Sequence, residues 1–447
     1  MISRDVPIGC PLHDRAVPLY GKVLAGQTWD RLRDRFGPVA PIQIEPGVAA
    51  WLVLGYDECV EVLRNPGVFT HDSRIWREIS EGRMLPDSPL MPIFGYRPNV
   101  LYADGPEHER LRSTIVDSLA RVPKQRLETD IRNLADQLID RFIADGRTDA
   151  LQQYARWLPI LVMNRIYGMD DRHGYLLAEV SRAVFDADPD AAGQANQQLI
   201  EYFGAVVAVK RERPGADVPS WLMEHDAELN DEEMVHQLAQ MMLGNCDPTA
   251  HLISNTLAAL LTDRTFWAQY ARSELQVEEA VNRVLWQDPP VPVLPARFAR
   301  TDTQLRGVPV KAGDALLLGL AAAHGDPVLG DVTGASQSSY VNRAHLAWGA
   351  GPHRCPAERL ARQIAYIGIG QLLHRIPTMR LAVPTSELNW RPVMYLRGLN
   401  ELPIEFPPGE PRLPSEMPEP TAPLAVASEN GKARAWFTRV TSWLRGR

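Results

Sequence analysis

The residues best suited to chemistry lie in one ten-residue stretch, residues 348–357, which reads W-G-A-G-P-H-R-C-P-A. It contains Cys355, and a helical run beginning at Glu358 follows directly. A sulfur placed there lies near the positive end of a helix dipole, which favours the thiolate form that binds metals. Gly349 and Gly351 allow the tight turn that brings amide N–H groups up to a sulfur ligand. A lone cysteine is more often a buried, inert thiol, but the spacing here favours a ligand.

The pattern aromatic-Gly-x-Gly-x-His-x-Cys-x-small resembles the haem-ligand loop of the cytochrome P450 family, the haem-thiolate monooxygenases. Trp348 stands where the family usually has phenylalanine, and Ala357 where it usually has glycine. The resemblance implies haem b (iron protoporphyrin IX) as cofactor and Cys355 as the iron ligand, whose electron density promotes O–O cleavage. It implies that His353 contacts a haem propionate. It also implies a mainly α structure, the cytochrome P450 fold, with a large helical domain and small β-sheets.

Two further segments resemble propionate-binding positions of the family. A helix is expected to begin at Pro106, because proline suits the first helical turn and acidic residues flank it. His108 and Arg112 follow four residues apart and therefore share one helix face. This two-residue motif is short, and the alternative to a haem contact is that both side chains face solvent. Arg297 falls at another such position, and with His353 these residues would supply the donors that buried anionic propionates need.

A long helix is predicted over residues 230–261, beginning with a capping side chain and acidic residues in its first turn. Its middle, residues 244–251, reads G-N-C-D-P-T-A-H and resembles the family's distal oxygen-activation segment. Aligned in this way, Asp247 is the acid and Thr249 the second threonine, and both are expected to relay protons. Pro248 replaces the first threonine. Since a mid-helix proline costs ~3 kcal/mol, we expect a bulge that tolerates it.

The next helix, expected to end before Asp288, departs from the family pattern. Most members carry Glu-x-x-Arg here, but this chain has Arg283 and Trp286 at those two positions. Glu279 and Arg283 form instead a four-residue step suited to a helical ion pair. Breaking one member of a buried pair strands a charge, whereas replacing both is nearly neutral. Because both positions differ, the pair has been replaced as a unit rather than lost by decay. In this respect the chain resembles actinobacterial members of the family that lack the motif.

Composition excludes several other classes of protein. A formal net charge of −8 argues against general nucleic-acid binding. Four widely spaced cysteines without a C-x-x-C pair predict neither a disulfide framework nor a zinc site. The N-terminus has no apolar segment of signal-peptide or anchor length. A cytoplasmic protein is therefore expected.

The C-terminal part of the chain differs from the rest, and we expect the haem-thiolate domain to span residues 1–406. Residues 407–430 are rich in proline and glutamate and cannot bury enough apolar surface to fold, so they are interpreted as a linker. Residues 431–447 combine basic residues with apolar ones at helical spacing. They predict a basic amphipathic tail that contacts an anionic membrane surface or a protein. A tail that packs on its own domain, or that is disordered, explains the composition equally well.

The expected function is insertion of one oxygen atom from O₂ into a small apolar substrate. Without a G-x-G-x-x-G fingerprint for flavin or nicotinamide, electrons are expected from a ferredoxin and a ferredoxin reductase. Arg354, Arg359 and Arg362 are candidates for that contact, although a solvated helix face explains them equally well. Pro248 and the missing Glu-x-x-Arg leave two alternatives open: a catalytically drifted haem-binding regulatory or complex-forming protein, and a peroxide-driven haem enzyme.

Overall fold

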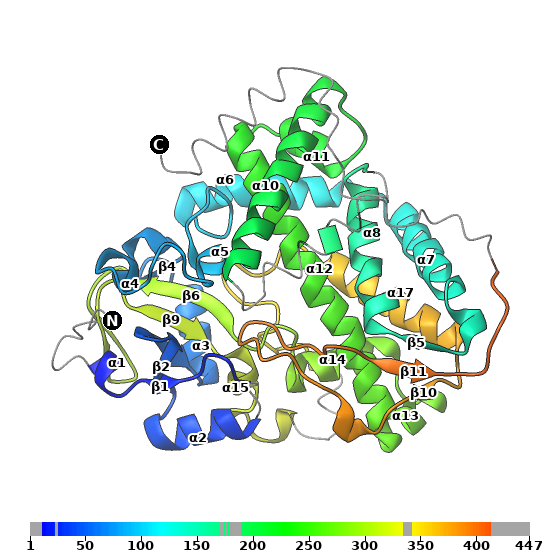
Figure 1. The fold of residues 1–447 in the computed structure, drawn as a ribbon. Coiled ribbons are helices and arrows are strands. Elements are labelled where there is room, and N and C mark those ends of the chain that lie inside the picture. The colour runs from blue at the N-terminus through cyan, green and yellow to red at the C-terminus, as the bar shows by residue number, and fades with distance from the viewer. Residues whose placement is uncertain are drawn as a thin grey trace.

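The computed structural model describes residues 11–412, except for residues 23–25, 170–173, 175–176, 179, 181–188 and 334–341. A sheet-rich part lies on one side of the molecule and a bundle of helices on the other (Figure 1). Of the expected linker only residues 407–412 belong to the described part, and the expected tail, residues 431–447, lies outside it.

The main sheet has six strands in the order β1-β2-β3-β9-β6-β4. Around Pro46 and Gly47 the chain forms a hairpin, in which β2 and β3 pair antiparallel with Ile42 opposite Ala50. Strand β6 was not predicted, since its segment looked only apolar and proline-rich; it pairs with β9 and carries Arg297. The six strands are β1 (Val17–Pro18), β2 (Val39–Glu45), β3 (Val48–Val53), β4 (Phe69–Thr70), β6 (Leu294–Ala299) and β9 (Ala315–Leu318).

The predicted helices form with shifts of a few residues at their ends, and several short helices join them. The longer ones are α2 (Gly26–Phe36), α3 (Tyr56–Arg64), α6 (Gly105–Ala120), α7 (Lys124–Asp140), α8 (Trp157–Ile166), α10 (Pro189–Glu212), α13 (Arg264–Ala271), α14 (Val277–Gln287) and α17 (Glu358–Arg375). The short ones are α1 (Pro11–Asp14), α4 (Arg77–Ser80), α5 (Met91–Phe94), α11 (Val218–Met223) and α15 (Leu320–His324).

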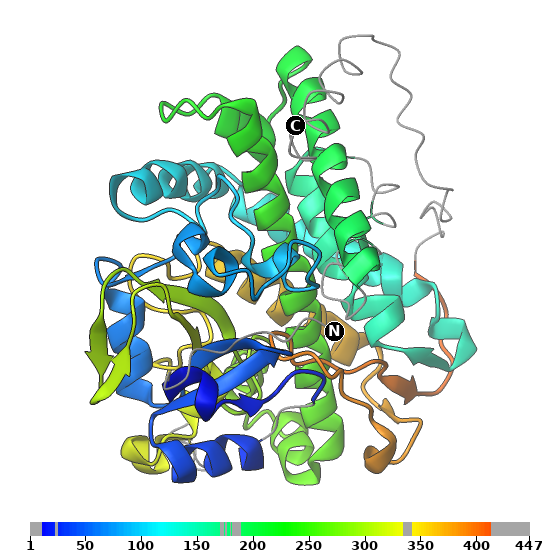
Figure 2. The same ribbon diagram turned by 60° about the vertical axis from the view of Figure 1, so that its left-hand side comes forward.

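Helix α12 (Asp231–Thr262) crosses the whole molecule, as Figures 1 and 2 show. It begins with a capping box, in which Asn230 Oδ1 accepts from the Glu233 N–H at 2.9 Å and Glu233 Oε2 from the Asn230 N–H at 3.0 Å. The expected bulge at Pro248 is wrong, because the helix is continuous through this residue. Helices α8, α10, α14 and α17 pack around α12. This packing offsets the loss of the hydrogen bond that proline cannot donate.

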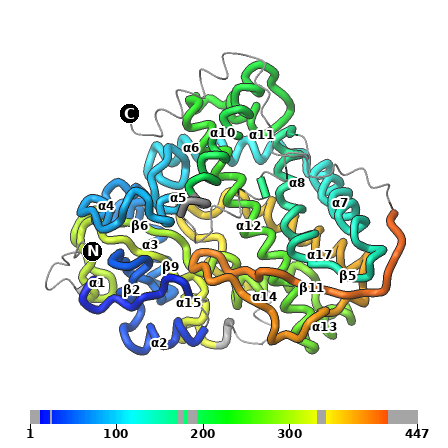
Figure 3. Tube along the Cα trace, viewed as in Figure 1, coloured from blue at the N-terminus to red at the C-terminus, as the bar shows by residue number. Residues whose placement is uncertain are grey.

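The C-terminal part of the described chain returns across the bundle, as the orange tube in Figure 3 shows. It contains a hairpin-like turn, in which the Arg391 N–H donates to the carbonyl of Gly398 at 2.9 Å. A Cβ at Gly398 would lie 2.1 Å from His251 Nδ1 of α12, so only glycine fits there. Small sheets complete the fold: β10 (Arg380–Leu381), β11 (Pro403–Glu405) and β5 (Arg147–Asp149), and the pair β7 (Thr303–Leu305) and β8 (Val308–Val310).

Among the described residues, no helix combines the length and the apolar character needed to cross a membrane.

Candidate functional site

The loop that carries Cys355 is held by its own backbone. The N–H of Gly349 donates to the carbonyl of Leu346 at 2.7 Å, and the N–H of Cys355 to the carbonyl of Trp348 at 2.9 Å. Gly351 has a φ of 68°, in the left-handed region, and a Cβ there would lie 2.4 Å from the Leu63 carbonyl oxygen. The glycine spacing is therefore a steric requirement of this loop.

Cys355 lies three residues before the start of α17, as predicted. Burial nevertheless raises the pKa of its thiol to about 11, and Glu358 raises it further. The Ala357 N–H, which donates to the sulfur, and the guanidinium of Arg112 act in the opposite direction without outweighing burial. The thiolate expected from the helix end alone is therefore not favoured, because desolvation exceeds the dipole. A bound metal ion would displace the proton, as it does for coordinating thiols.

Arg297 of β6 is a buried cation with no ion pair among the described residues. It is 3% exposed, and its Nη1 donates to the carbonyls of Pro295 and Ala296, each at 3.3 Å. Burial lowers its pKa to about 9, and the Asp104 carboxylate only partly opposes this. A guanidinium in this state is stabilised by a further anion.

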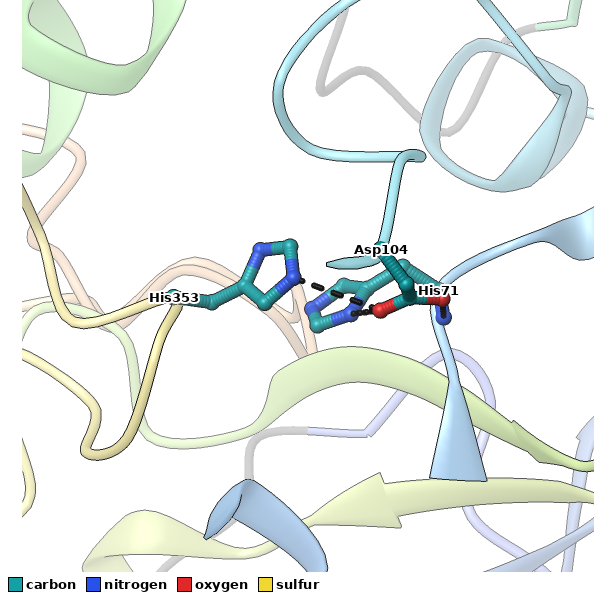
Figure 4. Close-up of side chains that lie close together, drawn as sticks. All are labelled: His71, Asp104 and His353. Atoms are coloured by element: carbon teal, nitrogen blue, oxygen red, sulfur yellow. Dashed lines mark hydrogen bonds and ion pairs between the residues drawn. The ribbon is translucent and has the colours of Figure 1, made fainter. Parts of the chain in front are cut away.

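Three imidazoles lie next to one another near this guanidinium. The ring of His353 stacks on that of His71 with 3.5 Å between centroids, and the His108 ring is 3.9 Å away. Asp104 Oδ1 lies 3.4 Å from both His71 Nδ1 and His353 Nε2 (Figure 4). Burial lowers the pKa of all three imidazoles, that of His108 to about 4, so they are neutral at pH 7.

The cluster has the composition of a metal site but the charge of an anion site. Single ligand atoms of His71, Asp104 and His353 lie within 4.8 Å of one another, as in a metal centre. The charge of Arg297 lowers the pKa of both His71 and His353, and the same field disfavours a metal cation. An anion fits better, because Nε2 of His71 and of His108 is buried without a hydrogen-bond partner among the described residues.

Arg112 of α6 connects this cluster to the cysteine loop. Its Nη2 donates to the carbonyl of Arg354 at 2.7 Å, one residue before Cys355. The structure thus brings His108, Arg112 and His353 together in space, and Arg297 acts on His353 from β6.

The two residues predicted for proton relay lie on α12 but do not share a face. Asp247 and Thr249 are 5% and 2% exposed. Residues two positions apart in a helix are separated by about 200° around its axis. The side chains of Asp247 and Thr249 therefore leave α12 in different directions. Thr249 Oγ1 donates to Asn245 Oδ1 at 3.4 Å. Pro248 has no N–H, so the Gly244 carbonyl lacks the hydrogen bond that this position normally donates.

Helix α14 holds an uncharged cluster instead of an ion pair. The indole N–H of Trp286 donates to the Asn342 carbonyl at 2.8 Å, and its ring meets the rings of His324 and His345 edge-on. The Leu346 N–H donates to His324 Nε2 at 2.8 Å, so Nδ1 carries the ring proton and donates to the Trp286 carbonyl at 3.0 Å. Burial lowers the pKa of His324 to about 4, in agreement with this neutral form.

The ion pair predicted between Glu279 and Arg283 is wrong. Arg283 Nη2 pairs with Asp263 at 3.0 Å, and its guanidinium lies over the Phe266 ring. Glu279 Oε2 accepts from the Gln276 N–H at 2.7 Å, at the start of α14. An unsatisfied N–H at the first helical turn competes for this carboxylate and wins.

Comparison with known proteins identifies the family. No family model matches the chain. Over 387 residues it is 30% identical to the cytochrome P450 monooxygenase PikC of Streptomyces venezuelae, and this alignment covers 85% of the chain and 90% of PikC. The chain belongs to the cytochrome P450 family. It is also 28% identical over 378 residues to cytochrome P450 107B1 of Saccharopolyspora erythraea, covering 83% of the chain and 93% of that relative.

Solved structures agree with this assignment. The P450 CYP154C4 from a Streptomyces species superposes with a TM-score of 0.81 at 26% identity, over 87% of this chain and 97% of that one. The expected mainly α P450 fold is therefore confirmed. The chain is a haem-thiolate monooxygenase, an oxidoreductase whose cofactor is haem. Its partners are a small-molecule substrate and an electron-donating redox protein.

The charge of the histidine cluster in this P450 fits the propionate end of haem. Arg300 pairs with the Asp104 carboxylate, the charge of Arg297 also acts on it, and a third guanidinium, that of Arg112, acts on His108 and His353. Two propionates would balance the remaining two positive charges. The buried nitrogens of His71 and His108 are the donors that such oxygens need.

Two residues of this cluster, His71 and Asp104, were missed in the sequence. His71 directly follows the two-residue strand β4 and belongs to no motif. Asp104 directly precedes α6, and its carboxylate does not cap the helix. It accepts instead from the His71 N–H at 3.1 Å, from the Thr70 hydroxyl and from Arg300 at 3.0 Å.

Replacing Asp104 by asparagine should destabilise the protein by about 3 kcal/mol at pH 7, because Arg297 loses its nearest carboxylate. Burial alone would raise the pKa of Asp104, but hydrogen bonds from His353, His71 and Thr70 hold it well below its ordinary value. Its contribution is therefore present above about pH 4 and is lost as pH falls further. Urea unfolding at pH 7 and pH 3 measures the difference, which should shrink at pH 3. Asp302→Asn, which removes an exposed carboxylate paired with Lys311, is the control.

Replacing Trp286 by arginine, the residue most P450s have there, should cost about 3–5 kcal/mol of unfolding free energy. The new guanidinium would be buried beside His324 and His345, while the acid Asp263 already pairs with Arg283. Trp286→Phe, which keeps a ring and loses the N–H, should cost only about 1 kcal/mol. Equal stability of the arginine variant and the wild type in thermal unfolding would contradict this account of α14.

Proposed function

We propose that this P450 hydroxylates an apolar small molecule, with Cys355 as the iron ligand. The observation that supports this most directly is the combination of a glycine-shaped cysteine loop, in which Cys355 is partly buried, with the neighbouring group of unneutralised cations. Arg112 connects the two by a direct hydrogen bond to the Arg354 carbonyl. When bound, haem supplies the oxygen-activating chemistry, and the protein supplies binding, orientation and protons.

His108, Arg112, Arg297 and His353, joined by His71, would hold the two propionates. Arg297 gains the anion that its burial requires, and the neutral imidazoles donate through nitrogens that lack partners. Asp104 would keep the rings of His71 and His353 oriented, since it lies 3.4 Å from both. The anchoring is rigid because these residues come from a helix, a strand and two loops that are packed together.

Protons would reach the site along α12. Asp247 is the acid of this path, and the Gly244 carbonyl, left free by Pro248, would hold a water on the same side of the helix. That water would take the place of the hydroxyl that the missing threonine provides in other members. Thr249 would contribute from the other side of the helix through Asn245, with which it forms a hydrogen bond. A buried, hydrogen-bonded route of this kind is what general acid catalysis requires.

Electrons would come from a ferredoxin and its reductase. Arg354 and Arg359 are exposed beside the cysteine loop, and Arg359 forms no ion pair within the described residues. Glu358 already binds Arg354 at 2.8 Å and Arg362 at 3.0 Å, so Arg359 is the arginine left for an acidic partner. The basic tail, residues 431–447, would add a contact to a membrane surface or a protein. The buried free thiols of Cys59 and Cys246 suit the cytoplasm.

The absorption spectrum of the dithionite-reduced protein under carbon monoxide tests the ligand. We expect a strongly red-shifted Soret band, which Cys355→Ser should abolish because a hydroxyl does not replace the thiolate. The control is Cys59→Ala. The thiol of Cys59 is buried and donates to the Val53 carbonyl, so this variant should keep the band. An imidazole-type spectrum of the wild type, or no haem, would overturn the proposed function.

Product formation with ferredoxin and reductase tests the proton path. Asp247→Asn should lower the rate at least about 100-fold, as loss of a general acid does, and Thr249→Val should lower it several-fold. Thr256→Val, which removes a hydroxyl that bonds within α12 to the Leu252 carbonyl, should leave the rate unchanged. If Thr249→Val behaves like Thr256→Val, the threonine has no part in the path.

A further inference from the structure

A second guanidinium, that of Arg97, has only neutral partners. It lies between α5 and α6, half-buried. Its Nη1 donates to the Gly95 carbonyl at 3.1 Å and to Tyr102 Oη at 3.3 Å, and its Nη2 to Asn196 Oδ1 at 3.1 Å. Within the described part of the chain it forms no ion pair. Other arginines of this region differ, since Arg74 pairs with Asp72 at 2.8 Å.

His236 of α12 lies close enough to Arg97 to feel its charge. The side chain is 5% exposed, and its Nδ1 is buried with no hydrogen-bond partner among the described residues. Burial and then the charge of Arg97 lower its pKa to about 4. Within the described residues, this imidazole and this guanidinium have no counter-ion.

This group of residues lies over the face of α12 that carries Asp247. His236 and Asp247 are eleven residues apart, three turns of the helix, so they share one face at a separation of roughly 16 Å along the axis. The segment that carries Arg97 is tied to α12, since the Val100 N–H donates to Gln237 Oε1 at 2.8 Å. It is tied to α10 through Asn196, and Figure 1 shows α5 beside α10.

We propose that Arg97, Asn196 and His236 bind a carboxylate of the substrate, at the end of the site remote from Asp247. The inference rests on the proposed function and names its substrate class: an amphiphile with an anionic head and an apolar chain, oxidised far from the head. Guanidinium groups bind carboxylates with a fork of N–H donors, and such charge-assisted bonds are stronger than the neutral ones that Arg97 makes here. The buried imidazole adds a further donor.

The competing explanation is that Arg97 is only a clamp that holds the α5–α6 loop on α10. A clamp would affect every ligand equally, whereas a carboxylate site distinguishes an acid from its ester.

The test uses the haem-loaded full chain and three probes of equal chain length: dodecanoic acid, methyl dodecanoate and dodecyltrimethylammonium. Dissociation constants are measured by the Soret shift and by isothermal titration calorimetry. We expect the acid to bind at least tenfold tighter than the ester and the cation to bind weakest. Equal affinity for acid and ester, or no binding of the acid, would overturn the proposal.

Variants separate the site from the clamp. Arg97→Gln should weaken the acid about tenfold and leave the ester unchanged, and Arg97→Lys should keep part of the preference. Arg74→Gln, at an arginine already paired with Asp72, is the matched control and should change neither. Equal weakening of acid and ester by Arg97→Gln would show a clamp and overturn the proposal. The carbon monoxide spectrum of the same samples reports the haem ligand separately.

Discussion

The buried positive charge of Arg297 is the constraint on which the site depends. A guanidinium at 3% exposure needs negative charge nearby, and the described chain provides only Asp104. That carboxylate also orients His71 and His353, and it accepts hydrogen bonds from the His71 N–H after β4 and from Arg300. The positive charge left over favours an anionic ligand beside the cysteine loop. Cofactor binding and folding are therefore coupled in this part of the molecule.

The α14 region shows how a member of the family can do without its usual ion pair. An indole, two imidazoles and main-chain groups fill the space, and each hydrogen bond of His324 has a defined direction. This cluster still connects α14 to Leu346 at the start of the cysteine loop. Neutral groups thus hold α14 against that loop, and they carry a smaller desolvation cost than an ion pair.

Helix α12 carries the residues that are proposed to deliver protons. It contains Pro248 while other helices pack around it, and proline has no N–H to donate to the Gly244 carbonyl. One face of the helix carries Asp247 in its middle and His236 three turns nearer its start. A substrate with a carboxylate head, as proposed, would explain why the hydrogen bonds of Arg97 within the described residues go to neutral groups.

The sequence by itself determined the family and indicated the cysteine loop and four of the five residues that are proposed to hold the propionates. Such motifs are local, because helix starts, glycine turns and four-residue steps depend on neighbouring residues. It failed where the partner is distant in sequence: Asp263 rather than Glu279 for Arg283, and Asp104 and His71 beside His353. It also did not predict strand β6, and it favoured the thiolate of Cys355, whose pKa burial raises. Only the tertiary structure decided these, because strand pairing, burial and desolvation depend on residues brought together by the fold.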